Sequence, residues 1–197
     1  MKKIESWHPI MMLMTLFLMN VSCVGNNIER EIGRFVSSVV DIPSNKMIEL
    51  HCSLYTDSAY ASSIIIVDYI DMESCSGCVA AQVAALERSA WAYNKCDSVG
   101  VLHVISMQTG DITPVYGDLC HERVRGKVYI DTCNAFLSAN PQFPSSPLLR
   151  TFVMDRKGTV LLVGNPFNGD RMKSMLDKIV DNKRRQHAAS VGMIGID

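Results

Sequence analysis

Two long apolar runs dominate the hydrophobic pattern after residue 60, and both predict buried strands. Residues 62–70 read SSIIIVDYI and residues 99–106 read VGVLHVIS. Strands that are β-branched and apolar on both faces are typical of the centre of a sheet covered by helices on both sides. Between them, residues 75–93 are rich in alanine and carry apolar side chains at helical spacing. The order strand–helix–strand predicts a parallel pair of strands joined by a crossover helix.

The C-terminal half predicts a β-hairpin followed by a closing helix. Residues 149–154 and 159–164 are apolar runs joined by the turn Asp155-Arg156-Lys157-Gly158. A helix is predicted over residues 170–182, and the basic, then Gly- and Ala-rich residues 183–197 are expected to form a flexible tail. Weaker signals predict a helix over 26–40, a strand over 47–54, a helix after Pro114, a strand over 128–130 and a short helix over 134–139.

The N-terminal residues have the pattern of an export signal followed by a lipid attachment site. Lys2 and Lys3 precede an apolar stretch over residues 10–19, which is shorter than the roughly 20 residues that a membrane-spanning helix needs. Asn20-Val21-Ser22-Cys23 resembles a bacterial lipobox, with Asn20 where leucine is usual. We therefore expect cleavage before Cys23 and acylation at Cys23. The alternative is an ordinary secreted protein in which Cys23 has no such role.

Composition narrows the classes of protein to which the chain can belong. Nineteen Lys+Arg residues against 20 Asp+Glu residues give a net charge of −1, which excludes nucleic-acid binding by bulk electrostatics. A hydrophobic fraction of 48% with 20% charged residues excludes a disordered chain. The expected organisation is a signal peptide (1–22), an N-terminal extension with a helix and a strand (23–61), one core domain (62–182) and a flexible tail (183–197).

One cysteine pair stands where redox chemistry is expected. Cys75-Ser76-Gly77-Cys78 directly follows a predicted buried strand and opens a predicted helix. This spacing places both sulfurs on one helical turn, and the helix N-terminus supplies unpaired N–H groups and a partial positive charge that favour a thiolate at Cys75. Thiols in such positions have pKa values as low as about 3.5–7.5, against about 8.5 for a free thiol. We expect Cys75 to attack a partner disulfide and Cys78 to resolve the mixed disulfide.

Other interpretations of the cysteines and histidines stay open. The CSGC segment could be a fixed structural disulfide, or half of a zinc site, although neither His51-Cys52 nor Cys120-His121 has the spacing of a second ligand pair. A second disulfide between Cys120 and Cys133 is one possible pairing. Cys52 behaves most simply as a buried small apolar residue, Cys96 as a packed or surface residue, and His103 as a core or edge histidine.

The cysteine pair and its surroundings resemble the small lipid-anchored thioredoxin-like proteins of Bacteroidetes-type bacteria. Glu73-Ser74-Cys75-Ser76-Gly77-Cys78 matches the family's Glu-x-Cys-x-x-Cys, and Thr151–Asp155 with Gly164-Asn165-Pro166 matches its late hairpin segment. The resemblance spans about residues 62–181. It implies an α/β thioredoxin-like fold, with a central mixed sheet, a C-terminal β-hairpin and helices on both faces.

The same resemblance implies thiol–disulfide oxidoreductase activity with Cys75 and Cys78 as the reactive pair and no cofactor. The implied partners are thiols or disulfides of exported proteins, with no nucleic acid, and the membrane is met through a lipid anchor only. The implied location is the periplasm, on the outer or inner membrane. A rival hypothesis is a non-catalytic thioredoxin-fold lipoprotein for binding or envelope assembly. A peroxidase is disfavoured, because Met72-Glu73-Ser74-Cys75 lacks the threonine of the Thr-x-x-Cys pattern.

Three details bear on activity. Thioredoxins place a cis-proline before the hairpin strand, where Pro147 is the nearest candidate and Leu149 occupies the strict register, so partner binding could differ. The dipeptide Ser-Gly between the cysteines is neither Gly-Pro nor Pro-His, which leaves the direction of electron flow open. Asp68, seven residues before Cys75, is a candidate proton acceptor for the resolving thiol, because burial raises the pKa of a carboxyl group. Alternatively, Asp68 satisfies a strand edge or faces water.

Overall fold

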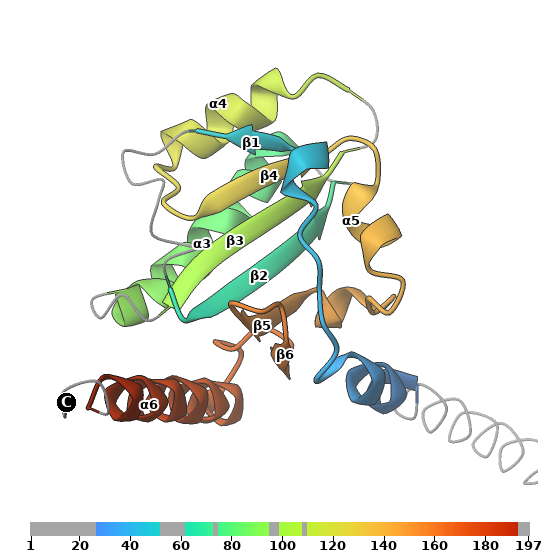
Figure 1. Ribbon diagram of the computed structural model, residues 1–197. Coiled ribbons are helices and arrows are strands. Elements are labelled where there is room, and N and C mark those ends of the chain that lie inside the picture. The colour runs from blue at the N-terminus through green and yellow to red at the C-terminus, as the bar shows by residue number, and fades with distance from the viewer. Residues whose placement is uncertain (1–26, 52–61, 73–74, 95–98, 108–109, 193–197) are drawn as a thin grey trace, which may run out of the picture.

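Six strands form one mixed sheet in the part of the chain that the structure describes (Figure 1). The structure is a computed structural model that describes residues 27–51, 62–72, 75–94, 99–107 and 110–192. The strand order is β1-β4-β3-β2-β5-β6, with β2, β3 and β4 parallel and the other neighbours antiparallel. The strands are β1 (Ile48–Leu50), β2 (Ile64–Asp71), β3 (Val99–Ser106), β4 (Lys127–Asp131), β5 (Thr151–Asp155) and β6 (Val160–Val163).

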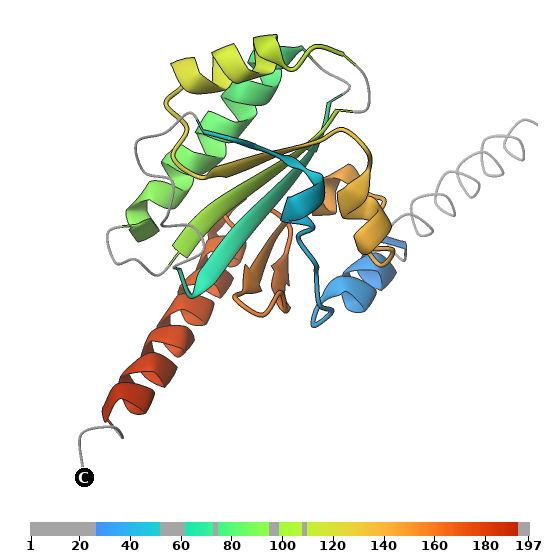
Figure 2. The ribbon, with the colours of Figure 1, turned by 45° about the horizontal axis from the view of Figure 1, so that its top comes forward.

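Helices cover both faces of this sheet. They are α3 (Ser76–Asn94), α4 (Thr113–His121), α5 (Ala135–Ala139) and α6 (Asp170–Gly192), with 3-10 turns η1 (Ser44–Lys46) and η2 (Pro147–Leu149) and a further helix over residues 27–35. Helices α3, α4 and α6 pack on one face, whereas α5 and the helix over 27–35 pack on the other (Figures 1 and 2). No helix in the described ranges has both the length and the apolarity needed to cross a membrane.

The alternation of side chains along β2 divides the core between these two faces. Ile64, Ile66 and Ile70 pack with residues of α3, while Val67 and Tyr69 pack with α5 and the N-terminal residues. All of these β2 side chains are nearly inaccessible to solvent. The strand is therefore buried on both faces, as its continuous apolar run predicts.

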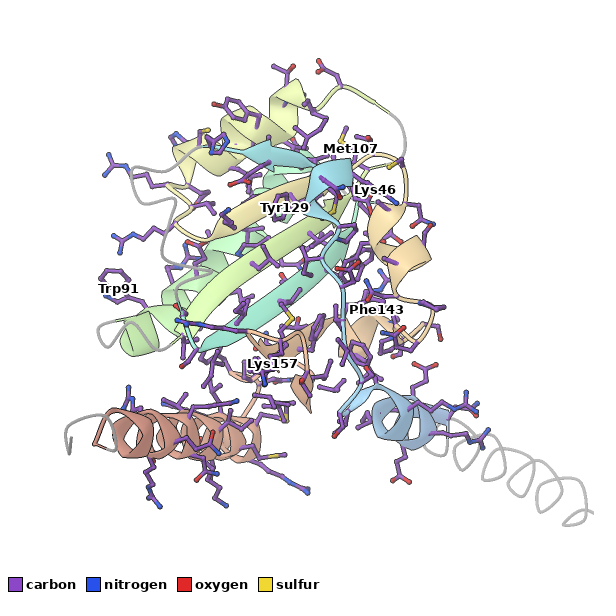
Figure 3. All side chains as sticks on the ribbon, in the orientation of Figure 1. Lys46, Trp91, Met107, Tyr129, Phe143 and Lys157 are labelled. Carbon is purple, nitrogen blue, oxygen red and sulfur yellow. A yellow bond between two sulfur atoms is a disulfide. The ribbon has the colours of Figure 1, made fainter. Side chains whose placement is uncertain are left out.

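Aromatic rings fix the N-terminal residues to the sheet. The Phe143 ring lies with its centroid 5.5 Å from that of Phe35 and 6.0 Å from that of Phe152, both in edge-on contacts (Figure 3). Residues 37 and 38 add backbone hydrogen bonds to Val160 in β6. The N-terminal residues thus belong to the same core as the hairpin.

The observed elements confirm the predicted order, and the ends of two helices differ most from the prediction. The N-terminal helix ends at residue 35 rather than 40, because Ser37 adopts a left-handed conformation (φ 66°) that turns the chain into an extended segment. Helix α6 continues to Gly192 through the residues predicted as a flexible tail, since the Lys, Arg and Ala residues there are good helix formers. The signal peptide, the lipobox and residues 52–54 of the predicted strand lie outside the described residues.

Candidate redox site

The cysteine pair lies where β2 gives way to α3, at the edge of the sheet where the parallel strands end. Cys75 and Cys78 form a disulfide with their Cα atoms 5.3 Å apart. Cys75 immediately precedes the first residue of α3, and its Sγ accepts the backbone N–H of Cys78 at 3.3 Å. A side-chain acceptor in this position satisfies one of the unpaired N–H groups of the helix terminus. The same contact will stabilise a negative charge on Cys75 when the disulfide is reduced.

Both cysteines are exposed, whereas the helix becomes buried directly after them. Val79 and Ala80 are only 2% exposed and anchor the first turn of α3 to the sheet. Because both cysteines are exposed, the disulfide is accessible to attack by a protein thiol.

The residues just before β5 contact the C-terminal end of β2, the strand that leads to Cys75. The carbonyl of Arg150 accepts the backbone N–H of Tyr69 at 3.1 Å, and the Arg150 guanidinium lies 3.8 Å from the carboxylate of Asp71. Pro147 opens η2 and the following Leu149 is buried. No cis peptide bond occurs among the described residues. Arg150 thus directly precedes the hairpin strand, and its ion pair with Asp71 was not predicted from the sequence.

Asp68 lies on the α3 side of β2 and is 3% exposed. Its Oδ1 accepts the hydroxyl of Thr151 at 2.8 Å, and its Oδ2 lies 3.7 Å from His103 Nδ1. Ile70, two residues nearer to the cysteines on the same face, belongs to the cluster that contains Val79 and Ala80. The structure confirms the burial that the sequence suggested, while a proton-accepting role for Asp68 stays a prediction.

A second carboxylate completes a buried ion triad around His103, which is inaccessible to solvent. Its Nε2 lies 3.5 Å from Glu87 Oε1 of α3. Burial alone would lower the pKa of His103, but the contacts and charges of Asp68 and Glu87 raise it to about 9. The imidazole is therefore positively charged at neutral pH. The sequence interpretation of a core histidine was correct for its burial but missed both ion pairs.

Glu87 also fixes the loop that follows α4. Its two carboxylate oxygens accept the backbone N–H groups of Arg125 and Gly126. Burial opposes the ionisation of Glu87, but the contact and charge of His103 together with these N–H groups lower its pKa. The Asp68–His103–Glu87 triad thus joins β2, β3 and α3 to the loop before β4.

The remaining cysteines do not pair as one interpretation suggested. Cys133 is an exposed free thiol, whereas Cys120 is disulfide-bonded, so the possible pairing of Cys120 with Cys133 is not formed. Cys133 directly follows the turn after β4, where its backbone N–H is bound by Asp131. Cys23, Cys52 and Cys96 lie outside the described residues. Within the described ranges, no three His, Cys, Asp or Glu side chains are grouped as a metal site would require.

Solved structures share this architecture. The C-terminal domain of a protein named as a thiol-disulfide oxidoreductase from Bacteroides thetaiotaomicron superposes with a TM-score of 0.50 at 12% identity, covering 75% of this chain and 97% of that one. The fold is thioredoxin-like. At such low identity the likeness establishes the fold alone.

Two further structures of lower similarity carry related names. The thioredoxin domain of a thiol-disulfide oxidoreductase from Bacteroides vulgatus gives a TM-score of 0.47 at 12% identity, covering 74% of this chain and 97% of that one. A thiol-disulfide oxidoreductase from Bacteroides fragilis gives 0.43 at 10% identity, covering 59% and 80%. No protein-family model and no curated protein sequence matches the chain.

Strands β3, β2, β5 and β6 lie side by side in the sheet, and the CxxC pair lies at the start of α3. The chain from α4 to α5 connects β3 to β5 and adds β4 beside β3. Strand β1 then pairs with β4.

Proposed function

We propose that the protein is a thiol–disulfide oxidoreductase of the cell envelope that acts on exported proteins through Cys75 and Cys78. The observation that carries the proposal is the exposed disulfide at the start of α3, in which Cys75 Sγ accepts the Cys78 N–H. This geometry favours the thiolate of Cys75, which is exposed and can act as the nucleophile. The names of the structural neighbours from Bacteroides support the same activity.

In the proposed reaction, the reduced protein exchanges its dithiol for a disulfide of the partner. The Cys75 thiolate attacks one partner sulfur, so that a mixed disulfide forms and the other partner sulfur leaves as a thiolate and takes up a proton. The Cys78 thiolate then attacks Cys75 Sγ, which forms the disulfide seen in the structure and releases the second partner thiolate. The partner gains two electrons, and the reverse sequence oxidises a partner dithiol.

The location is part of the proposal. The N-terminal signal pattern and Cys23 support export and acylation, which would place the domain in the periplasm at the outer or inner membrane. An exported chain meets an oxidising compartment in which disulfides persist. Labelling with radioactive palmitate should mark the full chain and should be lost in Cys23→Ala; equal labelling of both would refute acylation at this residue.

Trapping tests the activity. A Cys78→Ala variant expressed in the native envelope should accumulate mixed disulfides through Cys75, because no second thiol is present to resolve them. The matched Cys75→Ala variant should accumulate none. If neither variant traps a protein, the CSGC disulfide is a structural staple and the non-catalytic alternative holds. A preliminary assay is the reduction of insulin by the chain from residue 24, which contains every described residue.

A further inference from the structure

A carboxylate from helix α4 lies beside the helical turn that carries the cysteine pair. Helix α4 packs along the first turns of α3 (Figure 2). Its buried side chains Val115 and Leu119 belong to the same cluster as Val79 and Val83 of α3. Asp118 is three residues after Val115 and one before Leu119, which places its side chain at the border of the packed face of α4. It is partly buried there.

The distance from Asp118 to the cysteine turn is known at Gly77, one of the two residues between the cysteines. A methyl group built at Gly77 would lie 3.8 Å from Asp118 Oδ2, which is an ordinary van der Waals contact. The first turn of α3 contains no acidic residue of its own. Asp118 therefore brings a negative charge from another element to the turn that carries the disulfide. At the end of β2, Asp71 is paired with Arg150 at 3.8 Å.

A carboxylate in this position acts differently on the two redox states. Its favourable interaction with the N–H groups at the α3 N-terminus is present in both states and does not discriminate between them. In the reduced state alone, it repels a thiolate on the same turn, which opposes the ionisation that the Cys78 N–H favours. This repulsion favours the disulfide over the reduced, ionised pair, and it does not depend on which partner the protein meets.

We propose that Asp118 sets the redox balance of the Cys75–Cys78 pair by opposing the formation of the Cys75 thiolate. The inference rests on the proposed function, because Asp118 matters in the cell only if the cysteine pair cycles between dithiol and disulfide. With Asp118 present, the cysteine pair is a stronger reductant than it would be with the helix N-terminus acting alone. The cost to the reaction is a smaller fraction of reactive thiolate at neutral pH.

The test compares Asp118→Asn with the unchanged full chain, purified in mild detergent. After reduction, the rate of Cys75 alkylation by iodoacetamide is followed from pH 4 to 10 by mass spectrometry of the Cys75 peptide. We expect the midpoint pH of this rate profile to fall by about one unit in Asp118→Asn. At equilibrium with reduced and oxidised glutathione, the ratio of dithiol to disulfide should rise roughly threefold to tenfold in Asp118→Asn.

Three matched variants control for other effects. Asp181→Asn removes the same charge from an exposed position on α6 and should leave the midpoint unchanged. Asp118→Glu keeps the charge and should restore the original midpoint at least in part, whereas Asp118→Ser should repeat the effect of Asp118→Asn. Thermal unfolding of the oxidised variants confirms that each is folded. If Asp118→Asn and Asp118→Ser shift the midpoint no more than Asp181→Asn, the inference is wrong.

The outcome is separable from that of the proposed function. Alkylation and glutathione equilibration are properties of the purified chain alone, whereas trapping by Cys78→Ala requires a partner. A shifted midpoint without trapped proteins would refute the proposed function and retain the electrostatic role of Asp118. Trapped proteins with an unshifted midpoint would refute the role of Asp118 and retain the function.

Discussion

The charge on His103 should make the stability of the fold depend on pH above neutrality. The folded-state pKa of His103 is about 9, against 6.5 for an unperturbed histidine. Because the folded state holds the proton more tightly, the stabilisation is fully present below pH 6.5 and is lost as the pH rises through about 9. The difference between these two pKa values corresponds to about 3 kcal/mol of unfolding free energy.

Urea unfolding between pH 6 and pH 10 measures this contribution. The free energy of unfolding should fall by up to about 3 kcal/mol between pH 6.5 and pH 9.5, with the disulfide kept oxidised throughout. The control is His121→Gln, which replaces an exposed histidine and should show the same fall in unfolding free energy as the unchanged protein. In a His103→Gln variant the fall should be absent, and the stability at pH 6.5 should be lower by about 3–5 kcal/mol, because two buried carboxylates lose their cation.

A direct titration checks the cause. The imidazole resonances of His103, followed by nuclear magnetic resonance in the native protein, should change near pH 9 rather than near pH 6.5. If the unfolding free energy is constant from pH 6.5 to pH 9.5, or if the His103 resonances titrate below pH 6.5, then the histidine is neutral in the fold. The triad would then be two carboxylates around an uncharged ring, and the electrostatic account of it would be refuted.

Three further predictions concern packing and thiols. In Gly126→Ala, the new methyl group would lie 2.8 Å from the carbonyl oxygen of Val101, so thermal unfolding should show a loss of about 1–3 kcal/mol; unchanged stability would contradict this fit. The Asn140 side chain, 1% exposed, makes three hydrogen bonds, and Asn140→Ala should cost about 2–4 kcal/mol in urea unfolding, far more than the control Gln142→Ala with its one exposed bond. Maleimide should label the exposed free thiol of Cys133 in the unreduced protein, and Cys133→Ser should lower the labelling by one equivalent; an unchanged count would show that this thiol is not accessible.

Local signals in the sequence were sufficient for the strands, the crossover helix and the place of the cysteine pair at the start of that helix. The β-branched runs at 64–71 and 99–106 form β2 and β3, because such runs have no stable alternative to burial between two layers. Ser37, in contrast, ends the N-terminal helix through a left-handed turn, although no glycine or proline at this point of the sequence indicates a helix end. Its backbone N–H bonds to Val160, far along the chain, so that tertiary pairing decides the helix end.

The surroundings of the cysteines could not be predicted from the local sequence, because they depend on strand register and on the packing of α4. Asp68 and His103 lie directly opposite each other only because β2 and β3 pair in the observed register, and a slip by one residue would turn them to opposite faces. Asp118 reaches the cysteine turn only through the packing of α4, the helix with the weakest signal of its own. The cysteine pair is therefore specified by a four-residue motif, while the charged groups around it are specified by contacts between distant segments. A side chain added at Gly77 would contact Asp118, so Gly77→Ala and Asp118→Asn should shift the glutathione equilibrium non-additively when combined, which a double-mutant cycle measures.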